Sequence, residues 1–333
     1  MERRRIVLCL CLIMVVFLFV GGPSVWAQQK VVKVKMATAM PDSHPNAISI
    51  KYLSERIGEV SGGQLEREVF TAGSVGGEDE IVESVSLGMI QIYMGATAPL
   101  VNYVPQLSIF DLPYLFKNRD HVDKVLWGAV GDEITDLTVK KGFRILGWAD
   151  SGFQGFYNSR RPITSLADMK GLKMRVMKNN IRVKAMNSYG ASAVPLAWTE
   201  TYGAMETKVV DGCENSYETY RSGTQYEVAK YFTESDHAFM TATIIVNEKF
   251  YQSLSPKVKA VIQHACGLSS LRYRQLFEEK NIEAKKIVQE KGAVVNVLSD
   301  AAKKDFRKAA QPAYDDYSKA YGMRLLDRIR AAE

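Results

Sequence analysis

The chain has 333 residues, a formal net charge of +6, 24% charged residues and 47% hydrophobic residues. This length suits one large or two medium domains. The positive surplus is mild and is scattered among acidic residues, which argues against a nucleic-acid-binding surface.

The N-terminus predicts export. Glu2–Arg5 is basic, Ile6–Val20 is apolar, and a small residue, Ala27, follows a turn, which together are the parts of a signal peptide. We expect cleavage after about Ala27, so that residues 1–27 are removed and the mature chain lies in the bacterial periplasm. The alternative is an uncleaved membrane anchor, but the apolar run is short for a full span.

The first part of the mature chain alternates strands and helices. Apolar alternation, helical spacing and glycine-rich breaks set the expected bounds. The order β-α-β-α-β predicts a largely parallel sheet with helices on its faces. The predicted elements are strand 31–39, helix 47–60, strand 64–70, helix 78–87 and strand 89–94.

The same alternation restarts near residue 150, which indicates a second α/β unit. Its predicted strands are 143–149, 153–158, 172–177 and 193–196, and its predicted helices are 179–189 and 199–207.

The last third is mostly helical. Ser255-Pro256 is a strong helix start, and the helix is expected to reach Glu290, with a possible interruption at Gly267. A strand at 293–298 then leads to a helix that is capped by Ser299 and runs almost to the end. We expect the long helix that begins at Pro256 to brace both α/β units.

Motifs for catalysis or metal binding do not occur in the sequence. It has no nucleophile elbow, no phosphate-binding loop with its lysine, and no zinc-ligand spacing of cysteine and histidine. We therefore expect no catalytic residues, no metal and no cofactor. A secreted hydrolase or isomerase remains the less favoured alternative, because catalytic triads assemble in space rather than in sequence.

Two cysteines, Cys213 and Cys266, follow the predicted cleavage point. The oxidising periplasm permits a disulfide between them, and two separate buried thiols are equally compatible with the spacing.

Arg175 and Asn215 are the sharpest candidates for ligand binding. Arg175 lies on the predicted strand 172–177, where its planar fork of N–H donors fits a carboxylate bidentately. Asn215 ends a turn-like Asp-Gly-Cys-Glu-Asn run, and its amide can donate to a second ligand oxygen. Taken alone, each residue is better explained without a ligand: Arg175 by a surface ion pair, and Asn215 by a turn or helix cap.

Five segments together make the chain recognisable. It resembles the solute-receptor subunit of tripartite ATP-independent periplasmic (TRAP) transporters of the DctP type, over essentially the whole mature chain. In the element 211–215, cysteine and the following serine replace the glutamine and proline typical of the family. The segments are Gly171–Val176, Asp211–Asn215, Leu112–Phe116, Gly73–Glu78 and Pro162–Gly171.

The resemblance implies a two-lobed α/β fold of the periplasmic-binding-protein type, with a ligand cleft between the lobes and a long bracing C-terminal helix. Lobe I is expected to comprise 28–151 and about 241–280, and lobe II 152–240 and about 281–333. In such a protein, Arg175 pairs with the carboxylate of a small organic acid and Asn215 hydrogen-bonds to it.

The resemblance also places other side chains near the ligand. Trp198 is expected to pack on it, although ordinary core packing would also explain a tryptophan at this helix start. Glu78 is expected to contact ligand hydroxyls. His44 and Thr97 fall on loops that face the cleft, and Tyr217 is a weaker candidate.

One departure bears on the charge of the ligand. Many members of the family carry a second cation where this chain has Gln154. A neutral amide cannot neutralise a second anionic group, so the sequence favours a monocarboxylate, a hydroxy or oxo acid, or a small sulfonate. A C4-dicarboxylate and a sugar acid remain possible ligands.

The function implied is capture of the acid by hinge closure and its delivery to the membrane permease subunits of a TRAP transporter. Contact with the membrane is then expected only through that permease. A ligand-binding sensor module for a signalling partner is the alternative.

Overall fold

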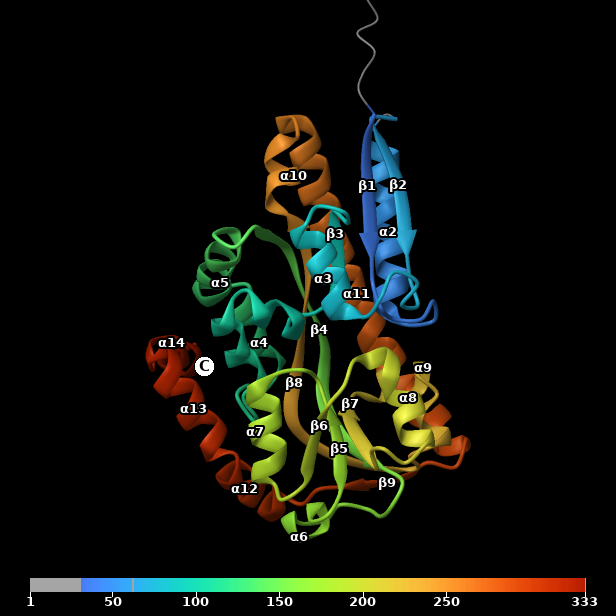
Figure 1. Ribbon diagram of the computed structural model, residues 1–333, viewed down its shortest axis with the longest axis vertical. Coiled ribbons are helices and arrows are strands. Elements are labelled where there is room, and N and C mark those ends of the chain that lie inside the picture. Colours follow the sequence, from blue (N-terminus) through green and yellow to red (C-terminus); the bar gives the residue numbers. More distant parts are fainter. Residues whose placement is uncertain (1–30, 62, 333) are drawn as a thin grey trace, which may run out of the picture.

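The computed structural model describes residues 31–61 and 63–332 (Figure 1). The predicted signal peptide, 1–27, lies outside these residues. Within the described part, no helix combines the length and the apolar character needed to cross a bilayer.

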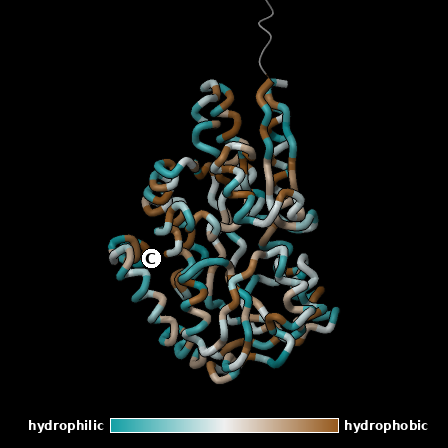
Figure 2. The backbone as a smooth tube through the Cα atoms, in the orientation of Figure 1, coloured by the Kyte–Doolittle hydropathy of each residue, from teal (hydrophilic) through white to brown (hydrophobic). Residues whose placement is uncertain are grey.

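A single mixed sheet of nine strands forms the centre of the molecule. Its order is β2-β1-β3-β8-β4-β7-β5-β6, and β9 pairs with β8. The edge strand β2 is hydrophilic in its middle, where its three charged residues follow one another (Figure 2). The strands are β1 (Val32–Ala37), β2 (Leu65–Phe70), β3 (Ile92–Ala96), β4 (Phe143–Asn158), β5 (Lys173–Val176), β6 (Ser192–Pro195), β7 (Gly212–Asn215), β8 (Tyr231–Asn247) and β9 (Val294–Val297).

The helices cover the faces of this sheet, and the six that the sequence predicted begin within two residues of their predicted starts. The helices are α2 (Pro45–Ser61), α3 (Glu78–Ser86), α4 (Arg119–Leu126), α5 (Ala129–Val139), α6 (Leu166–Met169), α7 (Asn180–Ser188), α8 (Trp198–Glu206), α9 (Tyr217–Ser222), α10 (Glu248–Ser253), α11 (Pro256–Glu290), α12 (Asp300–Ala309), α13 (Gln311–Tyr321) and α14 (Arg324–Ala331). Short 3-10 helices η1 (Ala98–Asn102), η2 (Pro105–Asp111) and η3 (Gln225–Glu227) complete the set.

The prediction of a largely parallel sheet is wrong at its centre. Strands β1, β2 and β3 pair in parallel, as do β5, β6 and β7, but β8 is antiparallel to both β3 and β4. The predicted strands 143–149 and 153–158 are one strand, β4, whose register with β8 shifts between Asp150 and Phe153. Gly152 has φ 72° in this shift, a conformation that favours glycine.

The fold has two lobes joined by these long strands. In the upper half of Figure 1, β1, β2 and β3 lie with α2 and α3, and we call this half lobe I. In the lower half, β5, β6 and β7 lie with α8 and α9, and we call this half lobe II. Strands β4 and β8 run through both halves and connect the two lobes.

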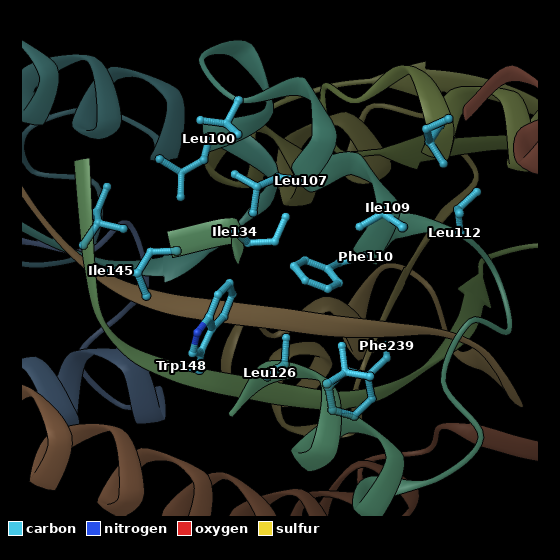
Figure 3. Close-up of a cluster of buried hydrophobic side chains, with 14 of the residues drawn as sticks. Leu100, Leu107, Ile109, Phe110, Leu112, Leu126, Ile134, Ile145, Trp148 and Phe239 are labelled. Atoms are coloured by element: carbon cyan, nitrogen blue, oxygen red, sulfur yellow. The ribbon is translucent and has the colours of Figure 1, made fainter. Parts of the chain in front are cut away.

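Each lobe has its own hydrophobic core. In lobe I, Phe110 and Trp148 pack edge to face with ring centroids 5.8 Å apart, next to Ile134 and Phe239 (Figure 3). In lobe II, residues of β4 and β5 pack against α12, whose Phe306 is fully buried.

The long helix α11 spans both lobes, as predicted. It packs against α2 of lobe I and α9 of lobe II, and it is continuous through Gly267. Two of its side chains fix it to the connecting strand: Tyr273 Oη lies 2.5 Å from Ser151 Oγ, and the Ser270 hydroxyl donates to the carbonyl of Trp148. Bracing of both lobes by this helix is therefore confirmed.

The C-terminal segment differs from the single predicted helix. It forms α12, α13 and α14, and Pro312 in the first turn of α13 explains the first break, since proline cannot continue a preceding helix. The segment 281–333 was expected in lobe II. Its helix α12 packs there, whereas Tyr317 of α13 and Ile329 of α14 join the core of lobe I.

Candidate functional site

The carboxyl ends of the parallel strands face each other across the two lobes. Ligands of α/β sheets bind at such ends, because loops there leave a crevice. A cavity lies at this place. It is lined by Met40, His44, Asn46, Glu78 and Ala96 from lobe I, by Arg175, Met177, Trp198, Asn215 and Thr219 from lobe II, and by Ser151 and Met240 of the connecting strands.

The space left between these side chains is about 30 Å³. This is room for a few water molecules at most. The two walls therefore lie close together in this structure, and a ligand larger than a few water molecules requires them to move apart.

Arg175 is buried in this cavity without a carboxylate partner. The side chain is 3% exposed, its Nε donates to the carbonyl of Leu196 at 3.0 Å, and its Nη1 lies 3.7 Å from Cys213 Sγ. In the described part of the chain, no carboxylate oxygen comes within 4.0 Å of it. A buried, unneutralised guanidinium is costly. It therefore offers its remaining N–H groups to an anion.

Asn215 lies beside Arg175, because β7 and β5 are neighbouring strands. Its Oδ1 accepts a long hydrogen bond, 3.4 Å, from Nε2 of Gln154. Its Nδ2 lies 4.0 Å from Cys213 Sγ and also interacts with the hydroxyl of Tyr157, and both contacts are weak enough for a ligand oxygen to replace them. The sequence predicted a turn at 211–215, which is wrong, since Gly212–Asn215 is a buried strand.

Trp198 forms a side wall of the cavity at the start of α8. A Cβ on Gly223 would lie 2.8 Å from its indole ring, so the glycine allows this ring to pack closely against the end of α9. The tryptophan is only partly buried and also lines an outer pocket between the lobes. It thus separates the cavity from solvent.

Glu78 lies on the lobe I wall, at the start of α3. Its Oε1 accepts from Tyr93 Oη at 2.9 Å and from the backbone N–H of Ala96 at 3.3 Å. Burial raises the pKa of Glu78, although these hydrogen bonds and the charge of Arg175 act in the opposite direction. The second carboxylate oxygen is left as an acceptor for a ligand hydroxyl.

His44 and Thr219 join the two lobes, with His44 Nε2 3.3 Å from Thr219 Oγ1. The backbone N–H of Asn46 donates to Nδ1 of His44, so the neutral ring carries its proton on Nε2 and donates to the threonine. Burial, helped by the positive charges of Arg221 and Lys280, lowers the pKa of His44 to about 3. The histidine therefore contributes a neutral donor rather than a second cation.

Asn46 lines the cavity and was not predicted. It is 3% exposed, and its Oδ1 has no hydrogen-bond partner. A buried amide oxygen without a donor is unfavourable. In the sequence, only its position after Pro45 at a helix start marks Asn46, and a polar residue at such a position usually caps the helix.

Three predicted site residues do not line the cavity. Thr97 is buried against Thr241, with the two Oγ1 atoms 2.6 Å apart. Tyr217 donates to Glu234 at 2.9 Å and stacks on Phe232. Gln154 lies behind Asn215 and does not line the cavity. The ligand contact that the sequence led us to expect for it is therefore not made in this structure.

Gln154 instead belongs to a buried ionic network beneath the cavity. Its Oε1 accepts from Nη1 of Arg182 at 2.8 Å, and Arg182 also pairs with Glu214 and Asp111, each at 2.7 Å. Glu214 further contacts Nε2 of His237 at 2.7 Å. Burial opposes ionisation of Glu214, but the charge of Arg182 and the hydrogen bond with His237 lower its pKa to about 2.

These two buried arginines differ in one respect that decides their roles. Arg182 is neutralised within the protein, whereas Arg175 is not. The cavity therefore combines one unneutralised cation with neutral donors and an acidic acceptor. Among the described residues, no group of three or more histidine, cysteine, aspartate or glutamate side chains is placed to hold a metal ion. Cys213 and Cys266, for which a disulfide was an open alternative, are both free and buried.

Known proteins are similar over most of this chain. A TRAP periplasmic solute-binding protein from Roseobacter denitrificans, solved with β-D-glucuronate, shares 30% identity, covers 91% of this chain and 100% of its own, and has a TM-score of 0.88. The sugar acid binding protein of Advenella mimigardefordensis in complex with galactonate shares 29% identity over 91% of this chain and 99% of its own, with a TM-score of 0.87.

A C4-dicarboxylate-binding periplasmic protein of Vibrio cholerae is 27% identical over 293 residues, which are 87% of each chain. The family model for bacterial extracellular solute-binding proteins, family 7, matches residues 36–320. The structure and these similarities agree on the resemblance seen in the sequence. The chain belongs to family 7 of the bacterial extracellular solute-binding proteins, the DctP family, and is a TRAP-type solute-binding protein.

Proposed function

We propose that this protein is a periplasmic receptor for a sugar acid that carries one carboxylate, such as an aldonate or a uronate. The observation that carries the proposal is the buried guanidinium of Arg175, which has no carboxylate partner and lies across the cavity from polar groups of lobe I. The carboxylate of the ligand binds Arg175 and Nδ2 of Asn215. Its hydroxyl groups bind Glu78 and Asn46.

Charge favours one anionic end on the ligand. Arg175 is the cation of the cavity, His44 is neutral, and Glu78 would repel a second carboxylate at the opposite wall. Gln154 still brings no second positive charge to the ligand, but it acts by orienting Asn215 rather than by touching the ligand itself. The relatives solved with glucuronate and galactonate support a hydroxylated acid.

The mechanism is capture by closure about β4 and β8, with no bond made or broken. The ligand contacts both lobes fully only when they are closed, so binding shifts the population towards the closed form. Micromolar affinity requires about 8 kcal/mol. One ion pair does not supply this, so hydroxyl contacts and packing on Trp198 must contribute the rest.

Export and delivery complete the proposal. Residues 1–27 direct the chain to the periplasm and are removed, and the closed receptor docks on the membrane subunits of a TRAP transporter. Lobe I then comprises 28–151 and about 241–280, together with α13 and α14, and lobe II comprises 152–240 and about 281–310.

A matched pair of ligands tests the proposal. D-Galactonate and D-galactarate share six carbons and differ at one end, which is a hydroxymethyl group in the first and a second carboxylate in the second. Calorimetry of the mature protein should give tighter binding of sugar monoacids such as galactonate than of galactarate or succinate. Tighter binding of the diacids would exclude the proposed ligand class, and turnover of a bound ligand would exclude a receptor without enzymatic activity.

A further inference from the structure

A second cavity, of about 780 Å³, lies outside the cleft between the lobes. It opens between the C-terminal helices α12 to α14 and the segment before α4, and none of its lining residues lines the cleft cavity. These helices run along one flank of the molecule and cover both lobes (Figure 1). The volume is in the usual range of small-molecule sites.

Two arginines in this second cavity are held over tyrosine rings. The guanidinium carbon of Arg307 lies 5.2 Å from the ring centre of Tyr114, and that of Arg330 lies 6.0 Å from the ring centre of Tyr314. The ring of Tyr314 is itself fixed, because its hydroxyl donates to the carbonyl of Pro113 at 2.7 Å. Stacking on a ring orients a guanidinium while leaving its N–H edge free.

Neither guanidinium is neutralised by a close carboxylate. In the described part of the chain, Arg307 has no carboxylate oxygen within 4.0 Å, and the nearest to Arg330 is an oxygen of exposed Asp327 at 4.0 Å. A third cation, Lys303, pairs with Asp236 at 2.7 Å. Asp236 is the acidic residue of the cavity lining, so the cations are in excess.

We propose that this second cavity binds a phosphate group. Two oriented guanidiniums beside a lysine are complementary to a compact anion with more than one negative charge. A phosphate monoester carries nearly two charges and three acceptor oxygens at neutral pH, which matches two N–H forks, whereas a single carboxylate satisfies one. The phosphate belongs either to a small soluble anion or to a lipid headgroup.

The test uses the mature protein with Arg175→Met, so that the cleft does not bind the probe. Pyrophosphate is titrated by calorimetry at ionic strengths of about 0.01 M and 0.15 M. In parallel, flotation with vesicles that contain phosphatidic acid, whose headgroup is a phosphate monoester, is compared with flotation with phosphatidylcholine vesicles. Each probe is repeated with Arg307→Gln and Arg330→Gln. The control is Arg272→Gln, because Arg272 is also exposed and stacked on a tyrosine, Tyr52, but lies on α11.

We expect binding that weakens with salt and that falls at least about tenfold in each of the two cavity variants but not in the control. Binding of pyrophosphate identifies a soluble phosphate as the source, and binding only of the phosphatidic acid vesicles identifies a headgroup. Binding of neither probe, or binding that is insensitive to both cavity variants, overturns the proposal. The outcome is independent of the sugar-acid proposal, because the cleft is disabled throughout.

Discussion

Two buried arginines should respond in opposite ways to the same substitution. Arg175 and Arg182 are each 3% exposed, but Arg182 pairs with two carboxylates and Arg175 with none. Methionine removes the charge at either position while keeping much of the volume. Arg175→Met should therefore weaken ligand binding strongly and spare stability, whereas Arg182→Met should lower stability.

The magnitudes follow from the contacts. Loss of one partner of a desolvated ion pair costs about 2–5 kcal/mol of binding, which is about 30- to 4,000-fold in Kd. In the free protein, Arg175→Met loses the hydrogen bond to Leu196, worth about 1–3 kcal/mol, but also removes an unneutralised buried charge, so the net change should be small. Arg182→Met leaves Asp111 and Glu214 without their cation and should cost about 3–5 kcal/mol.

Calorimetry with D-galactonate or D-glucuronate gives the change in Kd, and urea denaturation without ligand gives the change in stability. Arg175→Lys adds a control for geometry, because it keeps the charge but loses the planar fork. The reasoning fails if Arg175→Met binds as tightly as the parent protein. It also fails if this variant loses as much stability as Arg182→Met.

Three further predictions concern the walls of the cleft. Gly223→Ala should weaken ligand binding at least several-fold, because its new methyl group displaces the Trp198 ring although it does not touch the ligand. The control is Gly203→Ala, where a Cβ meets nothing within 4 Å. Calorimetry should show normal binding by this control. His44 has a folded pKa of about 3, below its ordinary 6.5, so its contribution to stability is present above pH 6.5 and is lost as the pH falls towards 3. His44→Gln should reduce this acid sensitivity in urea titrations, and an unchanged pH profile would show that the ring is not held neutral. Burial raises the pKa of Glu78 above its ordinary 4.5, so stability should decrease as the pH rises from 4.5 through the raised pKa. Glu78→Gln should flatten that decrease, and retention of the full decrease would assign it to other groups.

Local patterns were enough to predict several of the outer elements, although helices such as α4, α5 and α10 were not predicted. Strand β1 and helix α2 show clean alternation and helical spacing, and the Ser255-Pro256 start and the long helix after it are as expected. The long strand β8 is not among the predicted elements. It is buried along almost its whole length, so its sequence lacks the alternation that marks a strand with one solvent face.

Antiparallel pairing at the centre could not be read from local patterns either. The β-α-β order fixes parallel pairs within each lobe, but the partner of β4 is β8, which follows about seventy residues later. Only tertiary structure brings these strands together, so the prediction of a largely parallel sheet failed where contacts are most distant in sequence.

Five of the eight predicted site residues line one cavity. They are Arg175, Asn215, Trp198, Glu78 and His44. Their loops or strand ends lie at the carboxyl edge of parallel strands, which a sequence motif can indicate.

The remaining site assignments needed three dimensions. Gln154 is held by Arg182, a residue of α7 that no local pattern connects to it. Asn46 escaped notice because its buried oxygen becomes apparent only when both lobes are in place. Sequence patterns thus indicated the lobe II wall of the cavity, which contains Arg175 and Asn215, better than the lobe I wall that faces it.

A crystal structure of the mature protein with a bound sugar monoacid tests the central claim most directly. We expect the ligand to be enclosed between lobes that lie farther apart than in the present structure, with its carboxylate about 3 Å from the Nη atoms of Arg175 and Nδ2 of Asn215. Ligand hydroxyls should lie at similar distances from Glu78 and from Oδ1 of Asn46. A carboxylate bound elsewhere, with Arg175 left without an anion, would contradict the account.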